Sequence, residues 1–235
     1  MIQLPEVNAS FKEFYQMLIG PVKSKLLLTG IELGGFNQLS EPKSADAVAQ
    51  AIGAHAENTR LFLDGLAASD LVLKKNGLYE NAPGTQSFLV EGNSTFLGQM
   101  FSLQAQMWCG ALNDLPKLVK EGPPPPSPEA DMYGEEMWAQ FAVSMANYER
   151  AGVAQQAVEL VSELPEFPGF KKMLDLAGGP GLVGIAIVAS HPSMKGVIFD
   201  RPAVTKIAET FIKEYEMQSR IQVLSGDYNH DSIGE

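Results

Sequence analysis

Three acidic residues accompany three short apolar runs near the C-terminus of this 235-residue chain. Asp175 lies in the run 173–176, Asp200 closes the run that begins at residue 196, and Asp227 follows the run 221–225. Runs spaced roughly 25 residues apart predict parallel strands joined by helices, and the carboxyl ends of such strands meet at one edge of a sheet. Carboxylates gathered there accept hydrogen bonds from hydroxyl and N–H groups. We therefore expect a ligand of nucleoside type.

A glycine-rich turn follows the first run. Residues 179–184 read GPGLVG, a G-x-G-x-x-G pattern, and a predicted helix begins at Leu182. Glycines in such a turn allow the backbone to approach a ligand closely. Asp200 lies 21 residues after Gly179, where an acid can hold both hydroxyls of a ribose. By itself this pattern fits a dinucleotide as well as it fits S-adenosylmethionine.

Two details favour S-adenosylmethionine over a dinucleotide. Asp175 lies just before the glycines, where its carboxylate would repel a pyrophosphate and attract the ammonium group of the methionine moiety. At the third run, Asp227 can accept a hydrogen bond from the adenine amino group, and Tyr228 can lie on the adenine ring.

The elements that must position these residues follow two patterns. Helices are predicted over residues 8–37, over a segment capped by Ser44, and over a segment that begins at Asn58 or Thr59. Residues 71–81 predict a hairpin that turns at Asn-Gly. Helices followed by a hairpin are typical of a winged-helix fold, and further helices are predicted over 94–120 and 134–164.

Composition excludes several classes of function. Apolar residues make up 45% of the chain, charged residues 19%, and the net charge is −11, which disfavours nucleic acids and anionic membranes as partners. The single cysteine, Cys109, leaves no internal disulfide and no cysteine-based metal site. We see no metal-ligand cluster, signal peptide or spanning segment, and expect a soluble, cytoplasmic protein without a metal.

The motifs resemble those of the S-adenosylmethionine-dependent O-methyltransferases of the plant caffeate and acetylserotonin type. Residues 175–181 (DLAGGPG) are similar to the family's D-V-G-G-G-T-G, residues 199–202 (FDRP) to F-D-L-P, and residues 226–229 (GDYN) to G-D-F-F. Residues 29–36 are similar to the segment before the family's winged helix, and residues 141–145 to its substrate-side helix. The resemblance covers nearly the whole chain.

The resemblance implies an architecture of three parts. Residues 1–95 would form a mainly α, winged-helix-like dimerisation domain, and residues 96–165 a helical connector that includes the acceptor-pocket helices. Residues 166–235 would form a partial Rossmann-like α/β domain that binds S-adenosylmethionine, with only its first three parallel strands present. A homodimer is the expected assembly.

The resemblance also implies roles for single residues. The glycines would line the methionine and ribose, the acid of the second strand would take the ribose diol, and the third strand would hold the adenine. Phe141 and Met145 would face a small-molecule methyl acceptor, whose hydroxyl group would receive the methyl group. The predicted donor-binding residues are Asp175, Gly178, Gly179, Gly181, Asp200, Arg201, Asp227 and Tyr228.

The chain departs from the family pattern at the turn and at its C-terminal end. Ala177 replaces the family's first glycine, which is tolerable if its φ is negative, and Pro180 removes one backbone donor. The family's remaining strands and its catalytic histidine would follow Glu235, so we predict no catalytic residue in this chain and expect it to be inactive as given. None of the three histidines replaces that base: we expect His55 at the surface, and His191 as a cap of helix carbonyls.

Two alternatives stay open at this point. The chain can be a non-catalytic winged-helix regulator or donor-binding protein, with residues 58–70 as the recognition segment, although that segment carries Asp64 and Asp70 beside Arg60. It can also be an NAD-dependent oxidoreductase, because the glycine pattern alone does not distinguish the two ligands.

Overall fold

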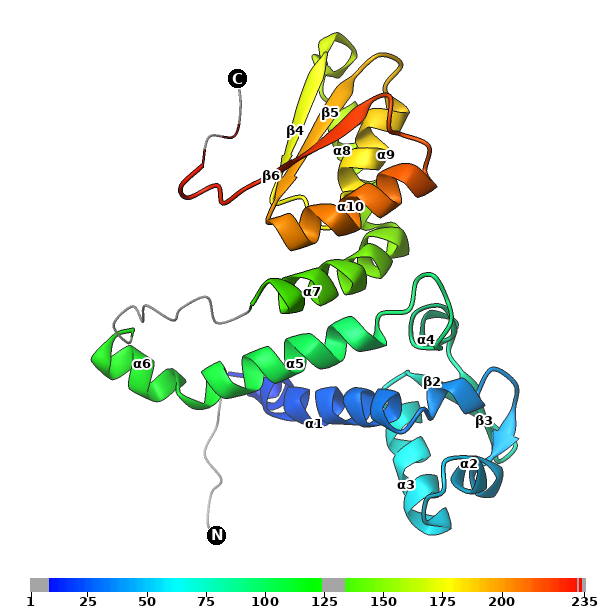
Figure 1. Cartoon of the computed structure of the whole chain (residues 1–235). Coiled ribbons are helices and arrows are strands. Elements are labelled where there is room, and N and C mark those ends of the chain that lie inside the picture. The colour runs from blue at the N-terminus through cyan, green and yellow to red at the C-terminus, as the bar shows by residue number, and fades with distance from the viewer. Residues whose placement is uncertain (1–8, 124–133, 232, 234–235) are drawn as a thin grey trace. The chain divides into compact units, whose positions relative to one another are not determined.

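The computed structural model describes residues 9–123, 134–231 and 233, and the chain divides into two compact units, Met1–Glu91 and Gly92–Glu235 (Figure 1). The helices of the first unit are α1 (Lys12–Glu32), η1 (Phe36–Gln38), α2 (Ala45–Ala51), α3 (Ala56–Ala67) and α4 (Pro83–Phe88). Its strands, β1 (Lys43–Ser44), β2 (Val72–Lys75) and β3 (Leu78–Asn81), form an antiparallel sheet in the order β1-β3-β2.

Local signals in the sequence account for the start of α2 and for the turn between β2 and β3. The Ser44 hydroxyl accepts a hydrogen bond from the Ala47 amide and caps α2, as predicted. The predicted hairpin is also confirmed, because Asn76 and Gly77 join β2 to β3 with φ values of 52° and 79°, the pair of positive angles that a two-residue turn of this kind requires.

The predicted start of α3 at Asn58 or Thr59 is wrong by one turn. The helix begins after His55, whose ring nitrogen Nδ1 accepts a hydrogen bond from the Asn58 amide. An imidazole can cap a helix in the way that a Ser or Asp oxygen does, and for this reason a search for the usual capping residues missed it.

In the second unit, α9 and α10 pack on a parallel sheet, α7 packs on α10 and α8 packs on α9 (Figure 1). Its helices are α5 (Gly98–Asn113), α6 (Leu115–Glu121), α7 (Glu135–Tyr148), η2 (Glu149–Val153), α8 (Ala154–Ser162), η3 (Phe167–Gly169), α9 (Leu182–Ser190) and α10 (Pro202–Glu214). Its strands are β4 (Lys172–Leu176), β5 (Lys195–Asp200) and β6 (Ile221–Ser225).

The three predicted parallel strands are confirmed. They pair in chain order, β4-β5-β6, with Asp175 opposite Ile198 and Ile198 opposite Val223. Each strand is followed by a turn at the same edge of the sheet, so the turns after β4, β5 and β6 lie next to one another.

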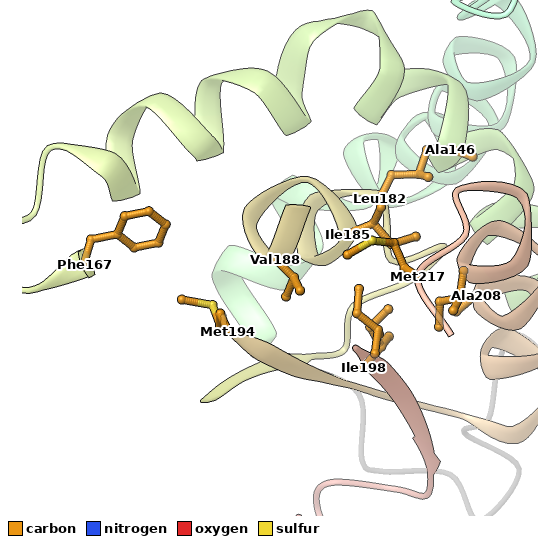
Figure 2. Close-up of a cluster of buried hydrophobic side chains, with 11 residues drawn as sticks. Ala146, Phe167, Leu182, Ile185, Val188, Met194, Ile198, Ala208 and Met217 are labelled. Atoms are coloured by element: carbon orange, nitrogen blue, oxygen red, sulfur yellow. The ribbon is translucent and has the colours of Figure 1, made fainter. Parts of the chain in front are cut away.

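One face of the parallel sheet holds the core of the second unit. Figure 2 shows Ile185 and Val188 of α9 against Ile198 of β5, with Ala208 of α10 beside them, and all four are buried. At the alternate positions, Leu174 and Leu176 of β4 and Leu224 of β6 are 40%, 46% and 37% exposed, whereas Phe199 of β5, in register between the last two, is buried.

The prediction that His191 caps the carbonyls at the end of its own helix, α9, is wrong, although its Nε2 atom lies 3.3 Å from the Pro168 carbonyl of η3. The ring of His191 is buried, and its Nδ1 accepts hydrogen bonds from the amides of Ser193 and Met194. Arg220 provides the cap, since its guanidinium donates to the carbonyls of Val188, His191 and Met194. A long cationic side chain from a distant segment thus satisfies the acceptors at the end of α9.

Within the described residues, no helix has both the length and the apolar character needed to cross a bilayer.

Candidate donor-binding site

A cavity of about 320 Å³ lies at the carboxyl ends of the three parallel strands. Such a volume is at the lower end of the range for small-molecule pockets. Three strand turns and one face of α7 enclose it. Its lining residues are Trp138, Phe141, Ala142, Met145, Glu149, Ala177, Gly178, Gly179, Pro180, Asp200, Arg201, Val204, Gly226, Asp227, Tyr228 and Asn229.

Asp200 is held rigidly at the end of β5. One carboxylate oxygen accepts a hydrogen bond from the Gly179 amide at 2.8 Å, and the other accepts from the Arg201 amide at 2.7 Å. Each oxygen keeps a further lone pair, so the carboxylate can still accept two hydroxyl groups. The same bonds tie the glycine turn after β4 to the end of β5.

Asp227 and Tyr228 border the cavity after β6. The Oδ1 atom of Asp227 accepts hydrogen bonds from the backbone and side-chain nitrogens of Asn229 at 2.9 and 3.0 Å. These bonds, the backbone bond first, lower the pKa of Asp227, so its carboxylate is ionised at neutral pH. Tyr228 is 56% exposed, so its side chain is accessible to a ligand.

The opposite wall is one face of α7 together with Glu149, the first residue of η2. Four residues of this wall line the cavity at intervals of three or four residues, the spacing of side chains on one helical face. They are Trp138, Phe141, Met145 and Glu149. The rings of Trp138 and Phe141 meet edge to face, with centroids 6.3 Å apart. The Arg201 guanidinium lies 5.6 Å from the centre of the Trp138 ring. This wall is apolar and aromatic except for Glu149.

Asp175 and Gly181 were predicted at the ligand and do not line the cavity. A Cβ at Gly181 would overlap the side chain of Ile198, so glycine is needed there for packing between α9 and β5. The Asp175 side chain lies between Gly178 and Gly184, where an added Cβ would come within 2.7 Å of its carboxyl atoms. Asp175 therefore lies directly behind the glycine turn.

The N-terminus of α9 decides between the two candidate ligands. The Val183 amide donates to the Glu149 carboxylate at 3.1 Å, and the Gly184 amide faces Asp175. A dinucleotide would place its pyrophosphate at these amides. Two carboxylates already lie there, so the site repels a phosphate and suits a ligand with positive charge.

Comparison with known proteins agrees with this chemistry. The family model of the O-methyltransferase domain matches residues 127–235, and that of the O-methyltransferase dimerisation domain matches residues 15–91. The chain belongs to the O-methyltransferase family. Enzymes of this family use S-adenosylmethionine, which is present in the structure of one of the relatives described next.

Individual relatives are distant in sequence. The N,N-dimethyltransferase OxyT of Streptomyces rimosus is 26% identical over 96% of this chain and 67% of its own length. The 3-hydroxy-5-methyl-1-naphthoate 3-O-methyltransferase of Streptomyces sahachiroi is 24% identical, with 90% and 61% covered. The human N-acetylserotonin methyltransferase structure, in complex with S-adenosylmethionine, superposes with a TM-score of 0.76 at 23% identity, with 100% and 70% covered. The chain spans about three fifths of the length of the curated relatives it matches.

The residues of this O-methyltransferase chain fit its family's cofactor. Asp200 and Asp227 lie on neighbouring strand ends, as a bound ribose and adenine require. The Oδ2 atom of Asp175 is buried behind the glycine turn and has no hydrogen-bond partner among the described residues.

The glycine turn contains one strained residue. Ala177 has a φ of 55°, so the condition under which this alanine was tolerable, a negative φ, is not met. A left-handed conformation costs a residue with a Cβ roughly 1–2 kcal/mol. Ala177 lines the cavity, so this strain lies at the site itself.

The two alternatives lose support. The carboxylates at α9 disfavour NAD. On α3, Arg60 is bonded to Glu57 and Asp64, and Lys74 of β2 to the same Asp64, so these cations are neutralised where a DNA-binding surface would need them.

Glu149 is the main residue of the site that the sequence analysis missed. It extends the predicted pair Phe141 and Met145 by one further step of four residues, and an acid on an otherwise apolar helical face is a signal that could have identified it.

Proposed function

We propose that this chain binds S-adenosylmethionine in the cavity at its strand ends and belongs to an enzyme that methylates a small-molecule hydroxyl group. When bound, S-adenosylmethionine supplies a methyl group that the adjacent sulfonium activates toward a nucleophile. The observation that carries the proposal is the pair of carboxylates, Glu149 and Asp175, at a helix N-terminus that would otherwise suit phosphate.

The chain's own residues would bind and orient both reactants. Asp200 would hold the ribose hydroxyls, Asp227 the adenine amino group, and the exposed ring of Tyr228 would stack on the adenine. Gly178 and Gly179 would allow the backbone to approach the methionine moiety. Orientation of two bound reactants is itself a large source of rate acceleration.

The α7 wall indicates the class of acceptor. Trp138, Phe141, Ala142 and Met145 form a surface that suits a flat, largely apolar molecule with a hydroxyl group. None of the three histidines lines the cavity, so we assign no proton acceptor for that hydroxyl among the described residues.

We further propose that the protein is a homodimer assembled through its first unit, which is the winged-helix-like part. Helix α1 exposes large apolar side chains, with Phe14 72% and Leu18 71% exposed. Patches of this kind mark association surfaces, and the match to a dimerisation domain over residues 15–91 points the same way.

Titration calorimetry with S-adenosylhomocysteine on the full chain tests the function. Asp200→Asn should weaken binding by about 1.5–3 kcal/mol, the value of hydrogen bonds to a charged group, which is roughly a factor of 10–150. The matched control is Asp46→Asn, because Asp46 is exposed in the first turn of α2 and should leave affinity unchanged. Wild-type protein that does not bind would refute the function, and Asp200→Asn with normal affinity would refute the ribose assignment.

A further inference from the structure

Arg201 lies between the strand ends and the α7 wall of the cavity. It follows Asp200 at the end of β5, occupies the N-cap position of α10, and lines the cavity. Its guanidinium lies 5.6 Å from the centre of the Trp138 ring, on α7. The Arg201 side chain is 33% exposed, so this contact is partly shielded from water and is stronger than it would be on an open surface.

Glu135 connects Arg201 to the start of α7. One carboxylate oxygen lies 3.9 Å from the Arg201 guanidinium, and the other accepts a hydrogen bond from the Ala203 amide at 2.9 Å. The first turn of α7 is thus bonded to the first turn of α10, and the two helices pack against each other (Figure 1). Because Trp138 follows Glu135 by three residues on the same helix, these bonds also hold the backbone that carries its ring.

The charge of Arg201 also reaches the proposed adenine position. Asp227, after β6, lines the same cavity. The pKa of Asp227 is lowered by the backbone bond from Asn229 first, and the charge of Arg201 is among the smaller causes. Arg201 therefore acts on one residue of the proposed adenine position, Asp227, and on one residue of the proposed acceptor wall, Trp138. Among the described residues, no other lysine or arginine lines the cavity.

The shape of a guanidinium allows it to connect two rings. The group is planar and stacks on aromatic faces, and Trp138 provides one such contact in the free chain. An adenine held by Asp227 and Tyr228 would be a neighbour of Arg201 in the same cavity and would provide a second ring. A side chain in contact with two rings moves less than one in contact with a single ring, so bound adenine would also restrict the motion of Trp138.

We propose that Arg201 is a positioning residue that couples the donor and acceptor parts of the site: bound adenine stacks on its guanidinium, and this contact fixes the Trp138 ring of the acceptor wall. The inference rests on the proposed function and adds to it a physical connection between donor binding and the surface that meets the acceptor. Coupling of this kind is reciprocal, so a flat acceptor that packs on Trp138 strengthens donor binding by the same factor.

The fluorescence of Trp138 tests the proposal. The chain has two tryptophans, and Trp108 is 58% exposed on α5, so Trp108→Phe leaves Trp138 as the sole reporter. In this full-length protein, saturating S-adenosylhomocysteine should lower the acrylamide quenching of Trp138 by about twofold, because a ring held in one position is less accessible than one that moves. Calorimetry on the same samples establishes that the ligand is bound.

Two further ligands show which part of the donor causes the effect. 5′-Methylthioadenosine, which carries the adenine and ribose without the amino-acid tail, should protect Trp138 as S-adenosylhomocysteine does. Homocysteine, which is the tail alone, should leave the quenching of Trp138 unchanged. Quenching that stays the same when S-adenosylhomocysteine is bound, or protection by homocysteine alone, would overturn the proposal.

Substitution of Arg201 in the Trp108→Phe protein locates the effect. Arg201→Met keeps the backbone amide that donates to Asp200 but removes the charged plane. It should weaken S-adenosylhomocysteine binding by roughly two- to fivefold, the value of one cation–π contact, and abolish the protection of Trp138. The matched control is Arg150→Met, because Arg150 also lies over a ring, Phe211, but does not line the cavity. It should keep both the affinity and the protection.

The outcomes separate this inference from the proposed function. If S-adenosylhomocysteine does not bind the wild type, the proposed function fails and the inference fails with it. If the ligand binds and Trp138 is still protected in Arg201→Met, this inference alone is refuted. Arg201→Gln should behave as Arg201→Met does and replaces it if the methionine variant does not fold, which urea unfolding shows.

Discussion

At the scale of single residues, the site holds two pairs of acids in different surroundings. Asp200 and Asp227 accept backbone hydrogen bonds at the edge of the cavity, whereas Glu149 and Asp175 lie deeper, where burial raises their pKa values. The first pair suits hydroxyl and amino groups, and the second suits a full positive charge.

Glu149 gives the stability of the ligand-free second unit a definite pH dependence. Its pKa is about 7 in the folded chain and near 4.5 otherwise, so the folded state holds more protons between these values and stability falls as pH rises through this range. Relative to Glu149→Gln, the wild type should lose roughly 2–3 kcal/mol between pH 4.5 and pH 8. Urea unfolding at several pH values measures this, and parallel profiles for the two proteins would contradict the assignment.

Ala177 offers a second test, because its strain can be removed. Ala177→Gly should raise the free energy of unfolding by about 0.5–1 kcal/mol, the relief of a positive φ less the added entropy of glycine in the unfolded chain. Ala154→Gly is the matched control: Ala154 has a helical φ of −62°, so the same change should destabilise by about 1 kcal/mol. Thermal or urea unfolding distinguishes them, and a loss of stability in both variants would show that Ala177 is not strained.

At the scale of elements, Arg220 connects the end of α9 to the start of β6. Its guanidinium donates to three backbone carbonyls, so Arg220→Met leaves these acceptors without a donor and should cost about 1.5–3 kcal/mol of stability. Lys206→Met, at an exposed position of α10, should cost almost nothing. Equal stability of the two variants by urea unfolding would mean that Arg220 does not cap α9.

The elements themselves could be predicted from the sequence because their signals are local. Apolar runs with glycine turns define β4, β5 and β6, and Asn76-Gly77 defines the first hairpin. What the sequence analysis missed depends on distant contacts. Glu149 is buried because η2 packs against α9. The His191 ring bonds the amides that follow it, and the carbonyl of His191 is bonded by Arg220, which lies 29 residues later in the chain. The φ of Ala177 likewise depends on the turn as a whole.

At the scale of the whole molecule, α1 should hold two copies together. Phe14 and Leu18 are four residues apart on an exposed helical face, so replacing both by Glu puts charge into the proposed dimer contact and should give monomers. Glu13→Gln, in the first turn of α1, is the control and should stay dimeric. Light scattering across a range of protein concentrations measures the mass, and a double variant that stays dimeric would place the contact elsewhere.

The central claim is that the cavity at the strand ends binds the methyl donor, and a crystal structure of the chain with S-adenosylhomocysteine tests it most directly. The account predicts the ribose hydroxyls at the Asp200 carboxylate, the adenine beside Asp227 and Tyr228, and the amino-acid tail beside Gly178 and Gly179. A nucleoside bound away from Asp200, or a ligand whose carboxylate rather than its ammonium group faces the N-terminus of α9, would contradict it.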